Sequence, residues 1–148
     1  MMDRIDEVKE LYQARIDALS LTSQDNDKNL LVNIYGRFTM NKKEYSLLIE
    51  YNYQHPEEGI YYGCKCERTE NMSRDEIDND WKEIIPQISD IICKKALLSP
   101  YGIEQGSYWP FWIRLDENEP TKIAPENMEM IKHYLDKKKD EYGIVFSN

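Results

Sequence analysis

The stretch LLVNIYGRFTMNKKEYSLLIEYNY, residues 30–53, decides the fold of this chain. On both sides of Asn41-Lys42, apolar side chains alternate with other residues, and this two-residue period is typical of β-strands. The two apolar sets are Leu30, Val32, Ile34, Gly36 and Phe38, and Tyr45, Leu47, Ile49, Tyr51 and Tyr53. A two-residue turn at Asn41-Lys42 pairs residue 38 with 45, 34 with 49 and 32 with 51, so both sets face the same side of a hairpin. A slip of one residue would put them on opposite sides, so the turn and the alternation favour the same register.

The pattern of residues predicts a third strand over residues 60–67 and a fourth strand over residues 108–115. The apolar positions of the third strand are Ile60, Tyr62, Cys64 and Cys66, which can pair with Tyr53, Tyr51, Ile49 and Leu47. In the fourth strand, the set that we assign to the core is Trp109, Phe111, Ile113 and Leu115, and the opposite set is Tyr108, Pro110, Trp112 and Arg114. Pro110 has no amide hydrogen to donate, which predicts a strand at the sheet edge. A short helix is the alternative for this segment, because its apolar run is almost continuous.

A long amphipathic helix is predicted after the third strand. It begins at the capping box Ser73-Arg74-Asp75-Glu76, where the serine oxygen accepts from the amide of Glu76. Its apolar stripe runs from Ile77 to Ile92, and Pro86 interrupts this stripe without changing its phase. We therefore expect a kink or a brief break near Ile85 within one element.

Two further amphipathic helices are predicted over residues 3–20 and from about residue 125 to residue 142, and residues 22–28 predict a polar loop. The order of elements is then α-β-β-β-α-β-α. We predict a single α+β domain over residues 1–148, in which an antiparallel sheet of three to four strands packs against two or three helices.

The composition limits the partners that this protein can take. There are 28 acidic and 19 basic residues, which gives a net charge of −9. Such a charge disfavours binding to nucleic acid or to an anionic membrane, and it favours a basic partner. No apolar run is long enough to span a membrane, and the N-terminal sequence lacks the pattern of a secretory signal, so we expect a cytoplasmic protein.

The face of the sheet opposite the predicted core, here called the outer face, carries a mixed aromatic and charged set. Its predicted members are Leu31, Asn33, Tyr35, Arg37, Leu48, Glu50, Tyr61 and Lys65, with Tyr108, Trp112 and Arg114 from the fourth strand. Aromatic and arginine side chains contribute strongly to binding at protein interfaces. The candidate partner-binding or ligand-binding residues are Tyr35, Arg37, Glu50, Tyr61, Lys65, Tyr108, Trp112 and Arg114. The alternative is that a helix covers this face and the tyrosines only shield it.

The sequence contains no specific catalytic or cofactor motif. Cys64, Cys66 and Cys93, with His55 or His133, would supply the ligands of a zinc site, but their spacing is unusual and the cysteines fall on predicted core stripes. We therefore predict no metal and no cofactor, and enzymatic activity is not indicated.

Two functions fit these observations. The first is a small acidic cytoplasmic module that binds another protein, of the inhibitor, immunity or anti-defence type, and acts on a basic partner. The alternative is a small-ligand-binding protein or cryptic enzyme with a pocket on the outer face. A concave pocket with converging polar groups would favour the ligand, and a flat, exposed aromatic patch would favour the protein partner.

Overall fold

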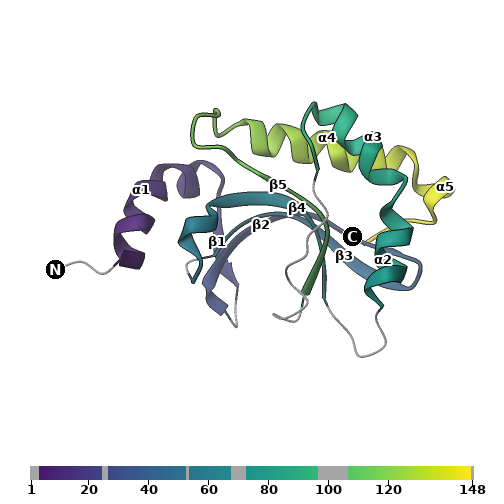
Figure 1. The fold of residues 1–148 in the computed structure, drawn as a ribbon, viewed down its shortest axis with the longest axis horizontal. Coiled ribbons are helices and arrows are strands. Elements are labelled where there is room, and N and C mark those ends of the chain that lie inside the picture. Colours follow the sequence, from purple (N-terminus) through teal and green to yellow (C-terminus); the bar gives the residue numbers. More distant parts are fainter. Residues whose placement is uncertain (1–3, 25–26, 53, 68–72, 97–106, 148) are drawn as a thin grey trace.

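The computed structural model describes residues 4–24, 27–52, 54–67, 73–96 and 107–147, and it shows an antiparallel sheet with helices on one face (Figure 1). The strands are β1 (Thr22–Gln24), β2 (Asp27–Met40), β3 (Lys43–Asn52), β4 (Ile60–Glu67), β5 (Ser107–Arg114) and β6 (Val145–Phe146). The helices are α1 (Arg4–Ala18), α2 (Arg74–Trp81), α3 (Ile84–Ile92), α4 (Ile123–Lys137) and α5 (Lys139–Tyr142), with a 3₁₀ turn η1 (Pro56–Glu58). The predicted α+β class is confirmed.

The sheet has six strands in the described residues, which is more than the three to four predicted. The strand order is β1-β2-β3-β4-β5, and β6 pairs with β2. The prediction of a loop over residues 22–28 was wrong, because Thr22–Gln24 pairs with β2 as strand β1. Both unpredicted strands are very short, and neither has an alternating apolar pattern of its own. β5 lies at the end of the strand order, as Pro110 predicted.

The hairpin of β2 and β3 turns where the sequence predicted. Asn41 and Lys42 have positive φ angles of 50° and 64°, the geometry that two-residue hairpin loops favour. Phe38 pairs with Tyr45, as expected from this turn. The register between β3 and β4 differs from the prediction by two residues, because Tyr51 rather than Tyr53 pairs with Ile60. A shift of two residues keeps every side chain on its predicted face.

A β-bulge at Tyr35 overturns the predicted faces of the first half of β2. The register shifts by one residue between Ile34 and Gly36, so Ile34 pairs with Leu48 rather than with Ile49. Leu31 and Asn33 therefore lie on the face that the helices cover, where Leu31 joins the main core and the Asn33 side chain donates to the backbone oxygen of Leu19. The assignment of Leu30, Val32 and Ile34 to the core face was wrong for this reason.

A second bulge reverses the start of β5. The pairing between β4 and β5 shifts between Cys64 and Cys66, opposite Trp109 and Pro110. Tyr108 consequently belongs to the main core, and Trp109 belongs to a separate cluster on the outer face. The sequence had placed these two side chains the other way round, although Phe111, Ile113 and Leu115 lie in the core as predicted.

The predicted long helix is two helices. The Ser73 side chain caps α2 by accepting from the Glu76 amide at 3.4 Å, as predicted. The chain breaks at residues 82–83 rather than near Ile85, and Pro86 lies in the first turn of α3, where its missing amide hydrogen leaves no intrahelical bond unmade. The last helix likewise divides into α4 and α5, which ends at Gly143 in the left-handed conformation.

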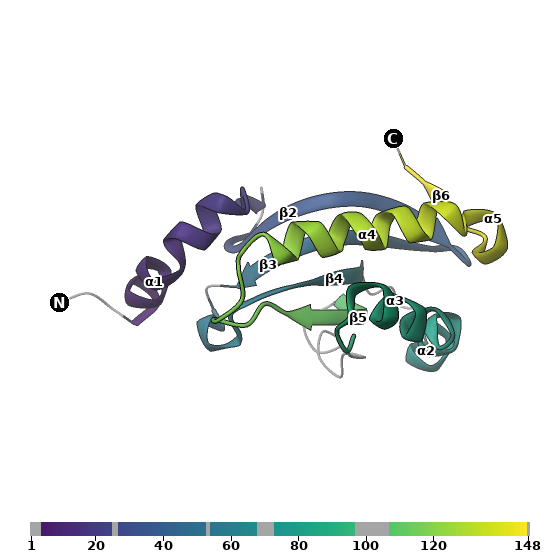
Figure 2. The same cartoon turned by 90° about the horizontal axis from the view of Figure 1, so that it is seen from above.

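All the helices that the structure describes pack on one side of the sheet or beyond its end. Figure 2 shows α4 running along the sheet beside α3, while α1 extends past the end of the strands. The main core lies between the sheet and α2, α3 and α4, and it includes Trp81, Ile88 and Met128 together with Ile16 of α1 and Leu19 just after it. The outer face of the sheet is left to face away from the helices.

Candidate functional site

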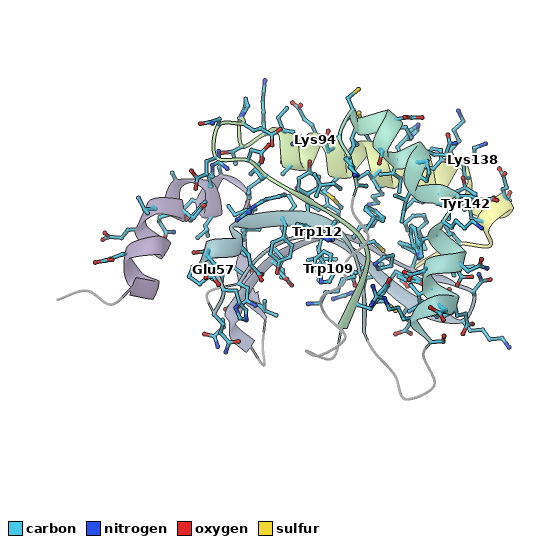
Figure 3. All side chains as sticks on the ribbon, viewed as in Figure 1. Glu57, Lys94, Trp109, Trp112, Lys138 and Tyr142 are labelled. Carbon is cyan, nitrogen blue, oxygen red and sulfur yellow. The ribbon has the colours of Figure 1, made fainter. Side chains whose placement is uncertain are left out.

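The outer face is the underside of an arched sheet in Figure 1, and no helix within the described residues covers it. A small apolar cluster lies there, separate from the main core. It consists of the buried residues Val32, Leu48 and Trp109, with Ile34, Tyr61 and Trp112 partly buried around them. Figure 3 shows Trp109 and Trp112 below the sheet, on the side away from α3 and α4.

The strand register arranges the outer face in rows that run across the strands, because residues paired on neighbouring strands share a face. Three successive rows are Arg37–Ser46–Lys65, Ile34–Leu48–Gly63–Trp112 and Val32–Glu50–Tyr61–Arg114. Consecutive rows are roughly 7 Å apart along the strands. The face therefore changes from polar to apolar and back to charged over a short distance.

A buried carboxylate lies at the centre of this face. Glu50 is 2% exposed, and Lys65 Nζ lies 3.0 Å from its Oε1 while the Tyr61 hydroxyl donates to its Oε2 at 2.5 Å. Burial, and then the charge of Glu50, raise the pKa of Tyr61 well above its ordinary value, so this hydroxyl stays protonated. The ammonium of Lys65 also lies 5.7 Å from the ring centre of Trp109, within the range of a cation–π interaction. The charge of Glu50 is thus fully paired.

A hollow of about 350 Å³, here called the outer hollow, opens over β2, β3 and Lys65. Its apolar lining is Leu30, Val32, Ile34 and Leu48. Within the described part of the chain, its polar lining is Arg37, Thr39, Glu44, Ser46, Glu50, Lys65 and Ser147, and Phe38 and Tyr45 also line it. Among the described residues, the guanidinium of Arg37 makes no hydrogen bond or ion pair, and it is exposed at the hollow.

The structure brings four of the eight predicted site residues to this hollow or to its edge. Arg37, Glu50 and Lys65 line it, and Tyr61 holds Glu50 in place. Trp112 lies next to Tyr61 on the same face, with 6.4 Å between their ring centres. Trp112 is therefore a neighbour of the hollow rather than part of its lining.

The other three predicted residues lie elsewhere. Tyr35 packs against the main core beside α4, because the bulge turns it to the helix-covered face. Tyr108 is buried and its hydroxyl donates to Asp78 of α2. Arg114 belongs by register to the outer face, but its guanidinium donates to the backbone oxygen of Glu57 at 2.5 Å, at the end of the sheet. The placement of Tyr35 and Tyr108 on the outer face was therefore wrong.

Sequence reasoning assigned Leu30, Val32 and Ile34 of the apolar lining, and also Trp109, to the core, whereas it placed Leu48 correctly on the outer face. The signals that point to them are Gly36 inside a strand and Pro110 near the start of another. Glycine inside a strand often accompanies a bulge, and proline is confined to edges and bulges. Each bulge exchanges the two faces of the strand beyond it.

No three histidine, cysteine, aspartate or glutamate side chains gather as metal ligands in the part of the chain that the structure describes. Cys64 and Cys66 are buried in the core, whereas Cys93 is exposed at the C-terminal cap of α3. The three cysteines considered for zinc are thus divided between the interior and the surface. Among the described helices, none has both the length and the apolar character that crossing a membrane requires.

Comparisons with known proteins found no similar protein, so function is inferred from the geometry of this face. The chain matches no protein-family model, no curated protein and no solved structure at a significant level.

Proposed function

We propose that this chain is a binding protein that takes a small ligand in the outer hollow. The observation that supports the proposal is the hollow itself, about 350 Å³ in volume and lined by both polar groups and apolar side chains. Small-molecule sites are typically concave, with roughly 300–1,000 Å³ of space, a largely apolar lining and a few polar groups that fix orientation. Of the aromatic residues proposed for a protein-binding patch, Tyr108 lies in the main core, and Tyr61 and Trp112 are partly buried.

The polar groups of the hollow favour binding over catalysis. A general base needs a free oxygen or nitrogen within hydrogen-bonding reach of the proton that it removes. Both oxygens of Glu50 already accept hydrogen bonds, from Tyr61 and from Lys65. The Tyr61 hydroxyl in turn keeps its proton because burial raises its pKa. We therefore propose a non-catalytic role for this paired group, in which it holds the floor of the hollow rigid.

A variant that fills the hollow tests the proposal. Ser46 is half-buried and lines the hollow, so Ser46→Trp places a large side chain in the ligand's space. Ser23→Trp is the matched control, because Ser23 is an exposed strand residue that does not line the hollow. We expect a screen of small molecules by thermal shift and native mass spectrometry to find a compound that stabilises the wild type and Ser23→Trp but not Ser46→Trp. Equal stabilisation of all three proteins, or no stabilising compound, would contradict the proposal.

A basic protein is the second candidate partner, and the charge of the chain favours it. With 28 acidic and 19 basic residues, the protein attracts a basic surface and speeds its encounter. This candidate would displace the first if the ligand screen stays empty while the protein captures a purified basic protein, with an affinity that falls as salt is added.

A further inference from the structure

Hydrogen-bond donors dominate the polar end of the outer hollow. The side chains there that can donate are Arg37, Thr39, Ser46, Lys65 and Ser147. Two carboxylates also line the hollow, but both oxygens of Glu50 are engaged, and the exposed Glu44 lies one row beyond Arg37. A group that accepts hydrogen bonds is therefore the natural complement of this end.

Arg37 is the donor best placed to bind the accepting group of a ligand. Arg37 on β2 and Lys65 on β4 both pair with Ser46 on β3, which lies between them. The two outer strands, β2 and β4, are roughly 10 Å apart. The charge of Lys65 is balanced by Glu50 at 3.0 Å. The guanidinium of Arg37 has no partner among the described residues, and its forked geometry matches a carboxylate through two parallel hydrogen bonds.

Beyond the row of Arg37, the side of the hollow formed by β2 is apolar, and Glu50 on β3 is engaged by Lys65 and Tyr61. Ile34 and Leu48 form the next row, and Val32 and Leu30 follow along β2. Val32 and Leu48 are only 6% and 4% exposed and form a well-packed floor, so the half-buried Ile34 and Leu30 offer most of the apolar area that a ligand can still cover. From the row of Arg37 to that of Leu30 there are three row steps, about 20 Å.

We infer that the ligand of the outer hollow is an amphipathic carboxylate, with its carboxylate at Arg37 and Ser46 and its apolar body on Ile34, Leu48 and Val32. This inference rests on the proposed function. It adds the chemical class of the ligand and the orientation in which it binds.

Three probes with the same alkyl chain and different head groups test the inference by calorimetry: decanoate, decanol and decyltrimethylammonium, each below its micelle concentration. At pH 7 the decanoate carboxylate is ionised. We expect decanoate to bind about tenfold more tightly than the other two, since hydrogen bonds to a charged group are worth roughly 1.5–3 kcal/mol. Arg37→Gln should lower the affinity for decanoate about tenfold and leave the affinity for decanol unchanged. Arg74→Gln, a change of the same chemistry on α2 outside the hollow, should alter neither.

The outcomes separate this inference from the function beneath it. Equal affinities for the three head groups, or an Arg37→Gln variant that keeps full affinity for decanoate, would overturn the inferred ligand class. If no alkyl probe binds, but another compound stabilises the wild type and does not stabilise Ser46→Trp, the inferred ligand class is wrong and the binding function stands. If no alkyl probe binds and the screen also finds nothing, both are wrong.

Discussion

At the scale of single residues, Glu50 stands out because its carboxylate is buried in the outer face. A buried carboxylate is tolerated only when partners replace the water that it has lost. Here Lys65 and Tyr61 replace that water, and each occupies one of the two carboxylate oxygens. The three residues come from neighbouring strands, so the group depends on the register of β3 and β4.

Removing the charge of Glu50 should destabilise the protein. In Glu50→Gln, Lys65 loses its counter-charge while it remains only 15% exposed, so we expect the free energy of unfolding to fall by about 3 kcal/mol. The double variant Glu50→Gln/Lys65→Met should recover much of this loss, because it also removes the uncompensated charge. Urea unfolding of the three proteins measures both effects. A single variant as stable as the wild type would show that the pair contributes nothing.

At the scale of elements, the two β-bulges decide what the sheet presents on each side. The bulge at Tyr35 moves Val32 and Ile34 to the outer face, and the bulge near Trp109 moves that side chain there too. Together they assemble an apolar cluster on a face that would otherwise carry mostly polar groups. The same two shifts return Leu31 and Tyr108 to the main core.

The contact between β4 and β5 requires Gly63. A Cβ atom at this position would lie 2.3 Å from the backbone oxygen of Phe111, which cannot move without separating the two strands. We expect Gly63→Ala to lower the free energy of unfolding by roughly 3 kcal/mol.

Gly36→Ala is the matched control for Gly63→Ala. The nearest atom to a Cβ at Gly36 is Cε of the flexible Lys132 side chain, at 3.4 Å. Its effect should stay within about 1 kcal/mol, since this neighbour can move. Chemical denaturation of both variants measures the difference, and equal effects would show that the approach of β4 and β5 is not the cause.

At the scale of the whole molecule, buried tyrosines make the free energy of unfolding depend on pH in the alkaline range. The chain has eleven tyrosines, and burial raises the pKa values of Tyr45, Tyr61, Tyr62 and Tyr108 above the ordinary value of 10.0. For Tyr62, burial is the main cause, partly offset by the hydrogen bond with Asn127, and the pKa is about 12. A tyrosine whose pKa is higher in the folded state keeps its proton there while the unfolded chain has already lost it.

The free energy of unfolding should therefore fall as pH rises. Below about pH 10 both states hold the proton and this contribution is constant; between about pH 10 and 12 the unfolded state releases it first and is favoured. Each such tyrosine contributes a slope of up to about 1.4 kcal/mol per pH unit, and Tyr62→Phe should make the slope shallower by that amount. Urea midpoints at a series of pH values give the slope, and tyrosinate absorbance gives the ionisation. Full ionisation of the tyrosines before the tertiary structure is lost would refute this expectation.

The sequence specified most local structure and part of the site. The two-residue turn at Asn41-Lys42, the Ser73 cap, the bounds of β4 and the edge position of β5 all follow from short-range rules, and the structure shows each of them. The placement of Glu50 and Lys65 on the same outer face also follows, because both alternate onto that face in their strands. β1 and β6 do not follow, because strands of three and two residues are defined only by their pairing with β2.

By itself, then, the sequence determined which segments form strands and helices, where the main hairpin turns and how acidic the whole is. Only the tertiary structure decided which side chains share a face and thus which of them line the outer hollow. The physical reason is the period of the β-strand: one extra residue in a bulge exchanges the two faces of everything beyond it. The place where that residue is inserted depends on the hydrogen bonds of the neighbouring strand, which a single strand's sequence does not contain.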